Sequence, residues 1–242
     1  MDPRLYHAHH QHYTEDLPFW RELAARQGDP ILELGCGTGR VLLPLVKAGH
    51  TVFGVDNDAA MLAFLSARLA PEQTNHALML LADMDDFQLA ERFPLVLLPC
   101  NTYSVLTAEV RGRVLNIVAQ LLAPGGMFAV SMPNPTLLAD LPAEGESELE
   151  LEFTVGEDAV QVYSAWQRAG DALTFIYDYD RLLADGLVER HTVQTTHRLV
   201  SAEQHEGELA AAGLRITETY GDFDKSAYTA DSPHLIFLAT IT

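Results

Sequence analysis

Hydrophobic and polar positions follow two different periods along the first 140 residues. Five short runs of consecutive apolar residues are typical of buried strands: Ile31–Leu34, Thr51–Val55, Ala77–Leu81, Leu95–Leu98 and Met127–Met132. Three segments between them carry apolar residues at helical spacing: Arg40–Ala48, Ala59–Ala70 and Glu109–Leu122. Strands that alternate with helices predict a parallel sheet covered by helices on both faces.

The chain begins with a segment that we expect to form an N-terminal helical arm over residues 1–30. Leu17, Trp20, Leu23 and Ala24 recur at helical spacing, and Gly28 ends the run. This arm precedes the first predicted strand.

The pattern changes between residues 148 and 200, where polar and apolar residues alternate with period two. Four such runs are separated by Gly156-Glu157-Asp158, Ala169-Gly170-Asp171 and Asp185-Gly186, which are residues typical of hairpin turns. We therefore predict an antiparallel meander inserted into the α/β domain, which comprises residues 31–147 and 201–242.

The last 40 residues return to the first pattern. Ser201–Ala212 is predicted to be a helix with Ser201 as its N-cap, and Leu214–Thr219 and Leu235–Ile241 are predicted strands. The sequence thus predicts a Rossmann-like, doubly wound, mostly parallel seven-stranded sheet with an antiparallel final strand.

Composition narrows the class of partner. The 242 residues include 15 Lys and Arg and 34 Asp and Glu, a formal charge of −19. This charge argues against nucleic acid and against an anionic membrane surface as partners. Only Cys36 and Cys100 are present, and no run reaches the roughly 18 apolar residues that span a bilayer. No secretory signal is visible in residues 1–15, so we expect a cytoplasmic protein.

The strongest chemical signal is a glycine loop, Glu33-Leu34-Gly35-Cys36-Gly37-Thr38-Gly39, between a predicted strand and a predicted helix. Glycine lets the backbone turn tightly and approach a ligand, and the helix N-terminus beyond offers free N–H groups. Position 40 is Arg, so the spacing is G-x-G-x-G and not the G-x-G-x-x-G of a dinucleotide site.

Two carboxylates stand at the ends of the next two strands. Asp56 follows the second strand, where an acidic residue accepts hydrogen bonds from ribose hydroxyls. Asp83 and Met84 follow the third strand, where a carboxylate can accept from an adenine amino group while Met84 packs on the ring. Asn57, Asp58, Asp85 and Asp86 are neighbouring polar residues that fit a solvated loop.

These residues carry a family resemblance. Residues 31–140 resemble a class I S-adenosylmethionine-dependent methyltransferase of a bacterial small-molecule subgroup. ILELGCGTGR, GVDND, LADMDDF, LVLLPCNTYSVL and LLAPGGMFAVSMPNP are similar to its five motifs, in order. The resemblance implies S-adenosyl-L-methionine as cofactor and S-adenosyl-L-homocysteine as product. It implies these cofactor-binding residues: Tyr13, Glu33, Gly35, Cys36, Gly37, Gly39, Asp56, Asn57, Met61, Asp83, Met84, Pro99 and Asn101.

Several other polar residues are candidates for the acceptor site. Asn101 to Ser104 follow the fourth strand, where an open α/β sheet holds its ligands. Tyr103 is therefore a candidate substrate-lining and catalytic residue, or a packing residue, and Asn134 after the fifth strand is a comparable candidate. His7, His9, His10 and His12 form a cluster that fits a solvated or cofactor-covering arm better than a metal site.

The sequence therefore predicts methyl transfer to a nitrogen or oxygen of a small-molecule acceptor by in-line displacement, without a metal. The alternatives are an NAD-dependent oxidoreductase and a non-catalytic S-adenosylmethionine-binding protein. Phe175, Tyr177 and Tyr179 alternate onto one face of the meander, which suits a roof over the acceptor or a contact within a homodimer.

Overall fold

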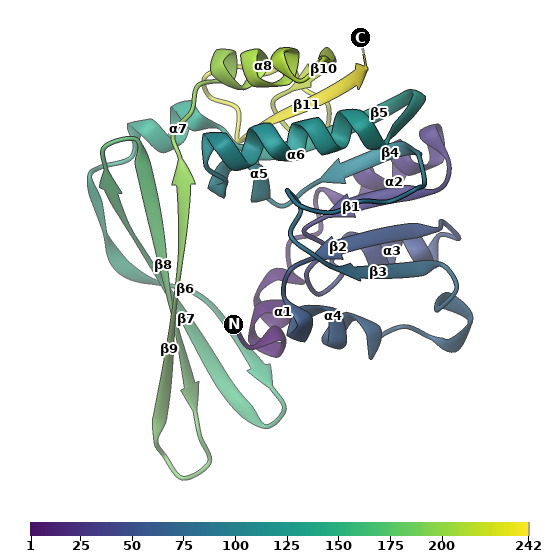
Figure 1. Ribbon diagram of the computed structural model, residues 1–242. Coiled ribbons are helices and arrows are strands. Elements are labelled where there is room, and N and C mark those ends of the chain that lie inside the picture. The colour runs from purple at the N-terminus through teal and green to yellow at the C-terminus, as the bar shows by residue number, and fades with distance from the viewer. Residues whose placement is uncertain (242) are drawn as a thin grey trace.

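The computed structural model describes residues 1–241, and its main body is a sheet covered by helices on both faces (Figure 1). Within these residues seven strands pair in the order β10-β11-β5-β4-β1-β2-β3. Strand β11 runs opposite to the other six, so it pairs antiparallel with β10 and β5, and the remaining pairs are parallel. The fold class predicted from the hydrophobic pattern is confirmed. The strands are β1 (Ile31–Leu34), β2 (Val52–Asp56), β3 (Ala77–Leu81), β4 (Phe93–Leu98), β5 (Leu122–Pro133), β10 (Leu214–Tyr220) and β11 (His234–Ile241).

Two hydrophobic layers hold the helices on the sheet. Helices α2 (Leu17–Gln27), α3 (Leu42–Lys47) and α4 (Ala59–Ser66) bury their apolar faces on one side. Helices α5 (Thr102–Val105), α6 (Ala108–Leu121) and α8 (Ala202–Ala211) do so on the other. A 3₁₀ turn, η1 (Pro71–Gln73), follows α4. Both layers consist of residues from predicted amphipathic segments, so burial of those faces stabilises the three-layer arrangement.

A second, four-stranded antiparallel sheet projects from the body after helix α7 (Pro135–Asp140) (Figure 1). Its strands pair in chain order: β6 (Glu144–Val155), β7 (Asp158–Ala169), β8 (Ala172–Leu182) and β9 (Val188–Arg198). The three hairpins turn at the glycine-containing segments that the sequence singled out, with Gly156, Gly170 and Gly186 at positive φ. We call this sheet the inserted sheet.

The N-terminal arm of residues 1–30 is built from more than one helix. It contains two helices, α1 (Pro3–His10) and α2, and the chain turns between them. Asp2 caps α1 by accepting from the backbone N–H of Arg4, and a proline opens each helix. The break lets α1 lie between α4 and the inserted sheet, where Leu5 packs against Val160 and Tyr179.

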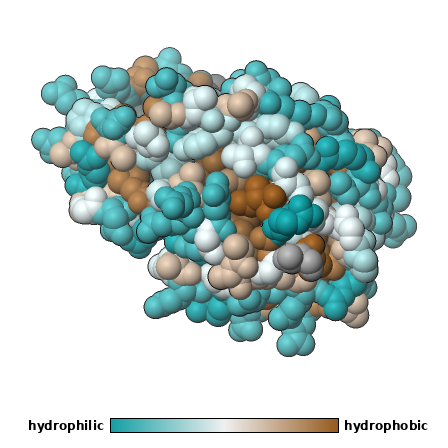
Figure 2. Space-filling view, turned by 90° about the horizontal axis from the view of Figure 1, so that it is seen from above, coloured by the Kyte–Doolittle hydropathy of each residue, from teal (hydrophilic) through white to brown (hydrophobic). Residues whose placement is uncertain are grey.

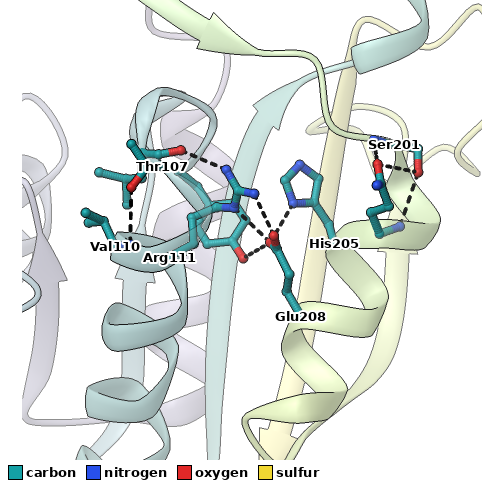
Figure 3. A network of polar contacts seen from close by, with 9 residues as sticks. Thr107, Val110, Arg111, Ser201, His205 and Glu208 are labelled. Carbon is teal, nitrogen blue, oxygen red and sulfur yellow. Dashed lines mark hydrogen bonds and ion pairs between the residues drawn. The ribbon is translucent and has the colours of Figure 1, made fainter. Parts of the chain in front are cut away.

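A polar network joins α6 to α8 on the face of the main sheet that these two helices cover (Figure 3). The Glu208 carboxylate accepts from Arg111 at 2.5 and 2.8 Å, from Tyr103 at 3.0 Å and from His205 at 3.1 Å. Burial raises the pKa of Glu208, but these hydrogen bonds outweigh it and bring the pKa down to about 2. The network therefore fixes α5, which carries Tyr103, against α6 and α8.

Three local differences from the predicted elements have simple causes. Helices α5 and α7 were not predicted, because they have only four and six residues and each follows a strand. Strand β5 starts at Leu122 and continues through the predicted turn at Pro124–Gly126, with an irregular register against β4.

The outer surface matches the acidic composition. The face uppermost in Figure 1 is mostly hydrophilic, and its apolar side chains gather in small separate patches (Figure 2). In the part of the chain that the structure describes, no helix is both long and apolar enough to cross a membrane.

Candidate active site

A cleft of about 670 Å³ lies between the carboxyl ends of β1, β4 and β5 and a cover formed by helix α1 and the inserted sheet. Loops at these strand ends form its floor, as expected for the ligand-binding edge of a parallel sheet. Helix α1 and strands β6, β8 and β9 close it from the other side. The floor residues include Glu33, Gly35, Cys36, Gly37, Asn101, Thr102 and Ser131, and the covering residues include Tyr6, His9, His10, Tyr13, Glu150, Tyr177, Thr195 and His197.

The glycine loop takes a backbone conformation that suits glycine. Gly35 and Gly37 have φ of +70° and +50°. A Cβ on Gly37 would lie 3.8 Å from the Tyr6 ring and 4.0 Å from the Asp56 carboxylate, in ordinary van der Waals contact. Gly35 and Gly37 line the cleft with backbone alone, so no side chain of theirs separates the loop from a ligand there.

A smaller pocket of about 240 Å³ adjoins the cleft and shares Gly35 with it. Asp56, Asn57, Asp83 and Met84 line it, all residues that the sequence analysis selected. Asp56 Oδ2 accepts from the Gly37 N–H at 2.7 Å, and Asp83 Oδ1 accepts from Asn57 Nδ2 at 2.7 Å. The two carboxylates therefore lie at neighbouring strand ends, one against the glycine loop.

Glu33 lies in the floor of the cleft with its side chain 2% exposed. Its Oε2 is buried and has no hydrogen-bond partner among the described residues. Burial raises the pKa of Glu33 to about 8, although the Arg40 guanidinium acts in the opposite direction. An unpaired buried acceptor is costly, so the site suits a ligand that brings a cation or a donor to this oxygen.

Arg40 fastens the N-terminal arm to the glycine loop. Its guanidinium donates to both carboxylate oxygens of Asp16 at 2.6 Å and to the Tyr13 carbonyl at 2.6 Å. It also contacts Cys100 Sγ at 2.8 Å. These contacts use four hydrogen-bonding directions of Arg40 and pair its charge, so it is not free to bind an anionic ligand.

A second polar cluster joins the arm to the inserted sheet. Glu150 Oε1 accepts from His9 Nε2 at 3.0 Å and from the Tyr13 hydroxyl at 3.1 Å, and His9 Nδ1 lies 2.7 Å from the Tyr179 hydroxyl. The hydrogen bond from His9 is the main reason that the pKa of Glu150 is lowered. Glu150 is therefore an anion at neutral pH at the edge of the cleft.

Two further histidines of the cleft are neutral. Burial lowers the pKa of both His10 and His197 to about 4. His10 Nδ1 lies 2.8 Å from the Tyr6 carbonyl, which can only accept, so Nδ1 carries the proton. Nε2 of His10 is then a hydrogen-bond acceptor.

Two predicted substrate-lining residues lie elsewhere, which corrects the sequence-based expectation. Tyr103 is fully buried beneath α5, and its hydroxyl donates to Glu208 and not to the cleft. Asn134 is also fully buried, and its amide nitrogen donates to the carbonyls of Thr229, Ala230 and Ser232. Both side chains are buried and hydrogen-bonded within the protein, so neither is available to an acceptor.

Three residues predicted to bind the cofactor do not line either pocket. Gly39 packs against α3 and α4, since a side chain there would lie 2.3 Å from Leu65. Met61 is 8% exposed on α4, and Pro99 precedes the floor loop at the end of β4. Cys36 and Tyr13, in contrast, line the cleft.

The histidine cluster divides between the two sides of α1. His9 and His10 line the cleft, whereas His7 lies against Arg68 and Phe64 of the main body. Within residues 1–241, no three potential ligands come together as a metal site.

The sequence did not single out Arg40, Glu150 or His197 as site residues. The one available signal was the alternation of His197 with Thr195 on one face of β9.

Comparison with known proteins shows that the chain is similar to methyltransferases. A family model described as a methyltransferase domain matches residues 31–126. The chain is 25% identical to the provisionally named methyltransferase YqeM of Bacillus subtilis (strain 168), over 98% of this chain and 93% of that protein. It is 26% identical to a cypemycin N-terminal methyltransferase of Streptomyces sp, over 86% and 82% of the two chains.

Solved structures share the fold over nearly the whole chain. The CcbJ methyltransferase of Streptomyces caelestis superposes with a TM-score of 0.79 at 22% identity, covering 94% of this chain and 96% of that one. The sugar N-methyltransferase KedS8 of Streptoalloteichus sp gives a TM-score of 0.75 at 22% identity, covering 95% and 87%. These similarities extend over the inserted sheet as well as the main body.

Proposed function

Since the chain is a class I S-adenosylmethionine-dependent methyltransferase, we propose that it methylates an amine nitrogen of a small-molecule acceptor bound under the inserted sheet. The cofactor supplies a methyl group on a sulfonium, which is already activated for transfer. The protein's own residues then have to bind the two reactants, align them and exclude water.

The described residues fit the cofactor in three places. The glycine loop faces the cleft with the bare backbone of Gly35 and Gly37, and the buried Oε2 of Glu33 lacks a partner that the cofactor's ammonium group would provide. Asp56, Asp83 and Met84 line the adjoining pocket, which supports ribose binding by Asp56 and adenine binding by Asp83 and Met84. Gly35, Cys36, Asn57 and Asn101 complete this proposed binding surface.

The observation that carries the proposal is the kind of polar group that faces the cleft. Its acidic side chains are those of Glu15, Asp16, Glu33, Glu150 and Asp222, and burial keeps the Glu33 carboxyl largely protonated at neutral pH in the free protein. Arg40 is the single Lys or Arg among the described lining residues, and Asp16 pairs it. The free groups are thus carboxylates and neutral imidazoles, which accept hydrogen bonds.

Such a lining favours an acceptor that donates hydrogen bonds and carries no negative charge. An amine meets both conditions, whereas a carboxylate or phosphate would be repelled with no free cation to bind it. An amine also needs no strong base, because its lone pair attacks directly once the proton of the ammonium form is lost. Similarity to a cypemycin N-terminal methyltransferase and a sugar N-methyltransferase supports this class of acceptor.

The inserted sheet is proposed as the roof of the acceptor site. Glu150, Tyr177, Thr195 and His197 come from three of its strands and all line the cleft. Tyr177 offers an aromatic surface between polar groups on either side, which suits a ring or a short chain. A homodimer contact through the outer face of this sheet stays an alternative role, and a cytoplasmic location stays a prediction.

A turnover assay tests the proposal. The protein is incubated with S-adenosylmethionine and three acceptors: an amino sugar methyl glycoside, a short peptide with a free N-terminus, and a phenol. We expect S-adenosylhomocysteine to form with at least one amine, in equal amount to the methylated amine. Turnover of the phenol alone would contradict the proposed acceptor class.

A further inference from the structure

His197 lies where the inserted sheet meets the floor of the cleft. It is on β9, its side chain is 8% exposed, and with Thr195 it lines the cleft opposite Asn101 and Thr102. The Phe175 ring packs against its imidazole in an edge-to-face contact with centroids 5.6 Å apart. This contact and the sheet hold the ring in one orientation.

Two hydrogen bonds determine which nitrogen of His197 carries the proton. The Ser104 hydroxyl lies 2.7 Å from the Asn101 carbonyl, and its one hydrogen must go there because a carbonyl only accepts. Ser104 Oγ therefore accepts from His197 Nδ1 at 2.8 Å. Nε2 then bears a lone pair, and among residues 1–241 no hydrogen bond occupies it.

The ring keeps this lone pair at neutral pH. Burial disfavours the imidazolium and lowers the pKa of His197 to about 4, so the ring is neutral above about pH 5. The same low pKa makes His197 a weak base toward an alkylammonium, whose pKa is far higher. The ring is suited to accept a hydrogen bond and not to remove a proton.

The position of His197 is tied to the cofactor loop through one short helix. Thr102, the first residue of α5, lies next to Gly35: a side chain on Gly35 would be 3.4 Å from Thr102 Cγ2. Ser104 follows on the same helix and binds His197. Movement of α5 is restricted because Tyr103, which lies between Thr102 and Ser104, donates a hydrogen bond to Glu208. Nε2 is thus connected through fixed contacts to the loop that we propose lies under the methyl donor.

We infer that His197 Nε2 accepts a hydrogen bond from an N–H of the acceptor amine and so turns the nitrogen lone pair toward the methyl group. This inference rests on the proposed amine function and names a substrate-positioning residue for it. In the reaction, the N–C bond forms as the C–S bond breaks and the sulfur keeps the electron pair. The nitrogen becomes an ammonium group and later releases its proton to water. Ser104 acts through His197, by keeping the proton on Nδ1.

The inference predicts a dependence on the number of N–H groups. A primary amine has two N–H groups at its first methylation and one at its second, so His197 can accept a hydrogen bond in both steps. A tertiary amine has none. We expect the wild-type protein to methylate primary and secondary forms of an acceptor and to stop at the dimethylated product.

The test compares His197→Phe, Ser104→Ala and the matched control His191→Gln, an exposed histidine on the same strand. The probes are the amino sugar and the peptide of the turnover assay, each in primary, N-methyl and N,N-dimethyl forms. We expect His197→Phe to lower kcat at least tenfold on N–H-bearing forms, with S-adenosylhomocysteine affinity and melting temperature close to wild type. Ser104→Ala should lower kcat less, and His191→Gln should leave it unchanged.

A spectroscopic readout separates positioning from packing. Nitrogen-15 NMR of the labelled protein with bound S-adenosylhomocysteine should show His197 protonated at Nδ1, and the Nε2 signal should move when the amine is added. An unmoved Nε2 signal, or full kcat in His197→Phe with an amine that the wild type methylates, would overturn the assignment of His197 alone. If the wild type methylates no amine, the proposed function fails and this inference fails with it.

Discussion

Arg40 and Asp16 form a two-point ion pair, with both hydrogen bonds at 2.6 Å, between the end of the glycine loop and the N-terminal arm. The two side chains are 15% and 7% exposed, so water screens the pair weakly. Trp20 donates to the same Asp16 carboxylate at 2.8 Å. The arm that covers the cleft is thus fastened to the loop at its floor.

Replacing Arg40 should loosen this cover. Arg40→Lys keeps a positive charge but cannot make the two parallel hydrogen bonds to Asp16. We expect faster amide hydrogen exchange in residues 1–16 and weaker S-adenosylhomocysteine binding by roughly tenfold, since a charged hydrogen bond contributes about 1.5–3 kcal/mol. Arg21→Lys on α2 is the control. Unchanged exchange in residues 1–16 would show that the ion pair does not hold the arm.

Cofactor binding should release a proton near neutral pH. Burial raises the pKa of Glu33 to about 8, so its carboxyl is largely protonated below that pH in the free protein. A cationic cofactor beside it favours the ionised form and lowers this pKa, so affinity should rise with pH up to about 8. Calorimetry in buffers of different ionisation enthalpy measures the protons released. Glu33→Gln should abolish the release, and equal release in this variant would assign the proton to another group.

The glycine loop should tolerate no side chain at Gly37. Gly37→Val puts a branched side chain into the cleft at a residue with φ of +50° and should abolish S-adenosylhomocysteine binding in calorimetry while the protein still folds. Gly49→Val is a matched control, because Gly49 also has positive φ but has nothing within 4 Å and lies away from the cleft. Asp56→Ala should weaken binding by about 1.5–3 kcal/mol through loss of hydrogen bonds to a charged group. Normal S-adenosylhomocysteine affinity in Gly37→Val or in Asp56→Ala would exclude the proposed role of that residue.

The Glu208 network should make folding stability depend on acid pH. The folded-state pKa of Glu208 is lowered from 4.5 to about 2, so its contribution is fully present above about pH 4.5 and is lost as pH falls toward 2. A shift of this size corresponds to about 3 kcal/mol. Denaturant unfolding of wild type and Glu208→Gln between pH 7 and pH 3 should show the difference between them shrinking with acid. A constant difference would mean that the Glu208 charge does not carry the stabilisation.

The predicted cofactor-binding residues that line the two pockets share one property: their position depends on local chain order. A strand followed by a glycine loop and a helix puts Gly35 and Gly37 at the sheet edge, and Asp56 and Asp83 follow from the adjoining strand ends. The fold class followed in the same way from the alternation of strands and helices. These features need no knowledge of how distant segments meet.

The residues that were missed or misplaced depend on long-range packing. Glu150 and His197 reach the cleft only because the inserted sheet folds back over the main body, which hydrophobic alternation does not reveal. Tyr103 follows a strand end as an acceptor-site residue would, but the turn of α5 directs its side chain into the core toward Glu208. Position along the chain was enough to predict the glycine loop, whereas the direction of the Tyr103 side chain could be seen only in the structure.

Transfer of a labelled methyl group tests the central claim most directly. The protein is incubated with S-adenosylmethionine carrying carbon-13 in its methyl group and with an amino sugar methyl glycoside that offers both an amine and hydroxyl groups. The product is examined by carbon-13 NMR and mass spectrometry. The account predicts the label on nitrogen, in equal amount to S-adenosylhomocysteine. Label on oxygen, or formation of S-adenosylhomocysteine without a methylated amine, would contradict it.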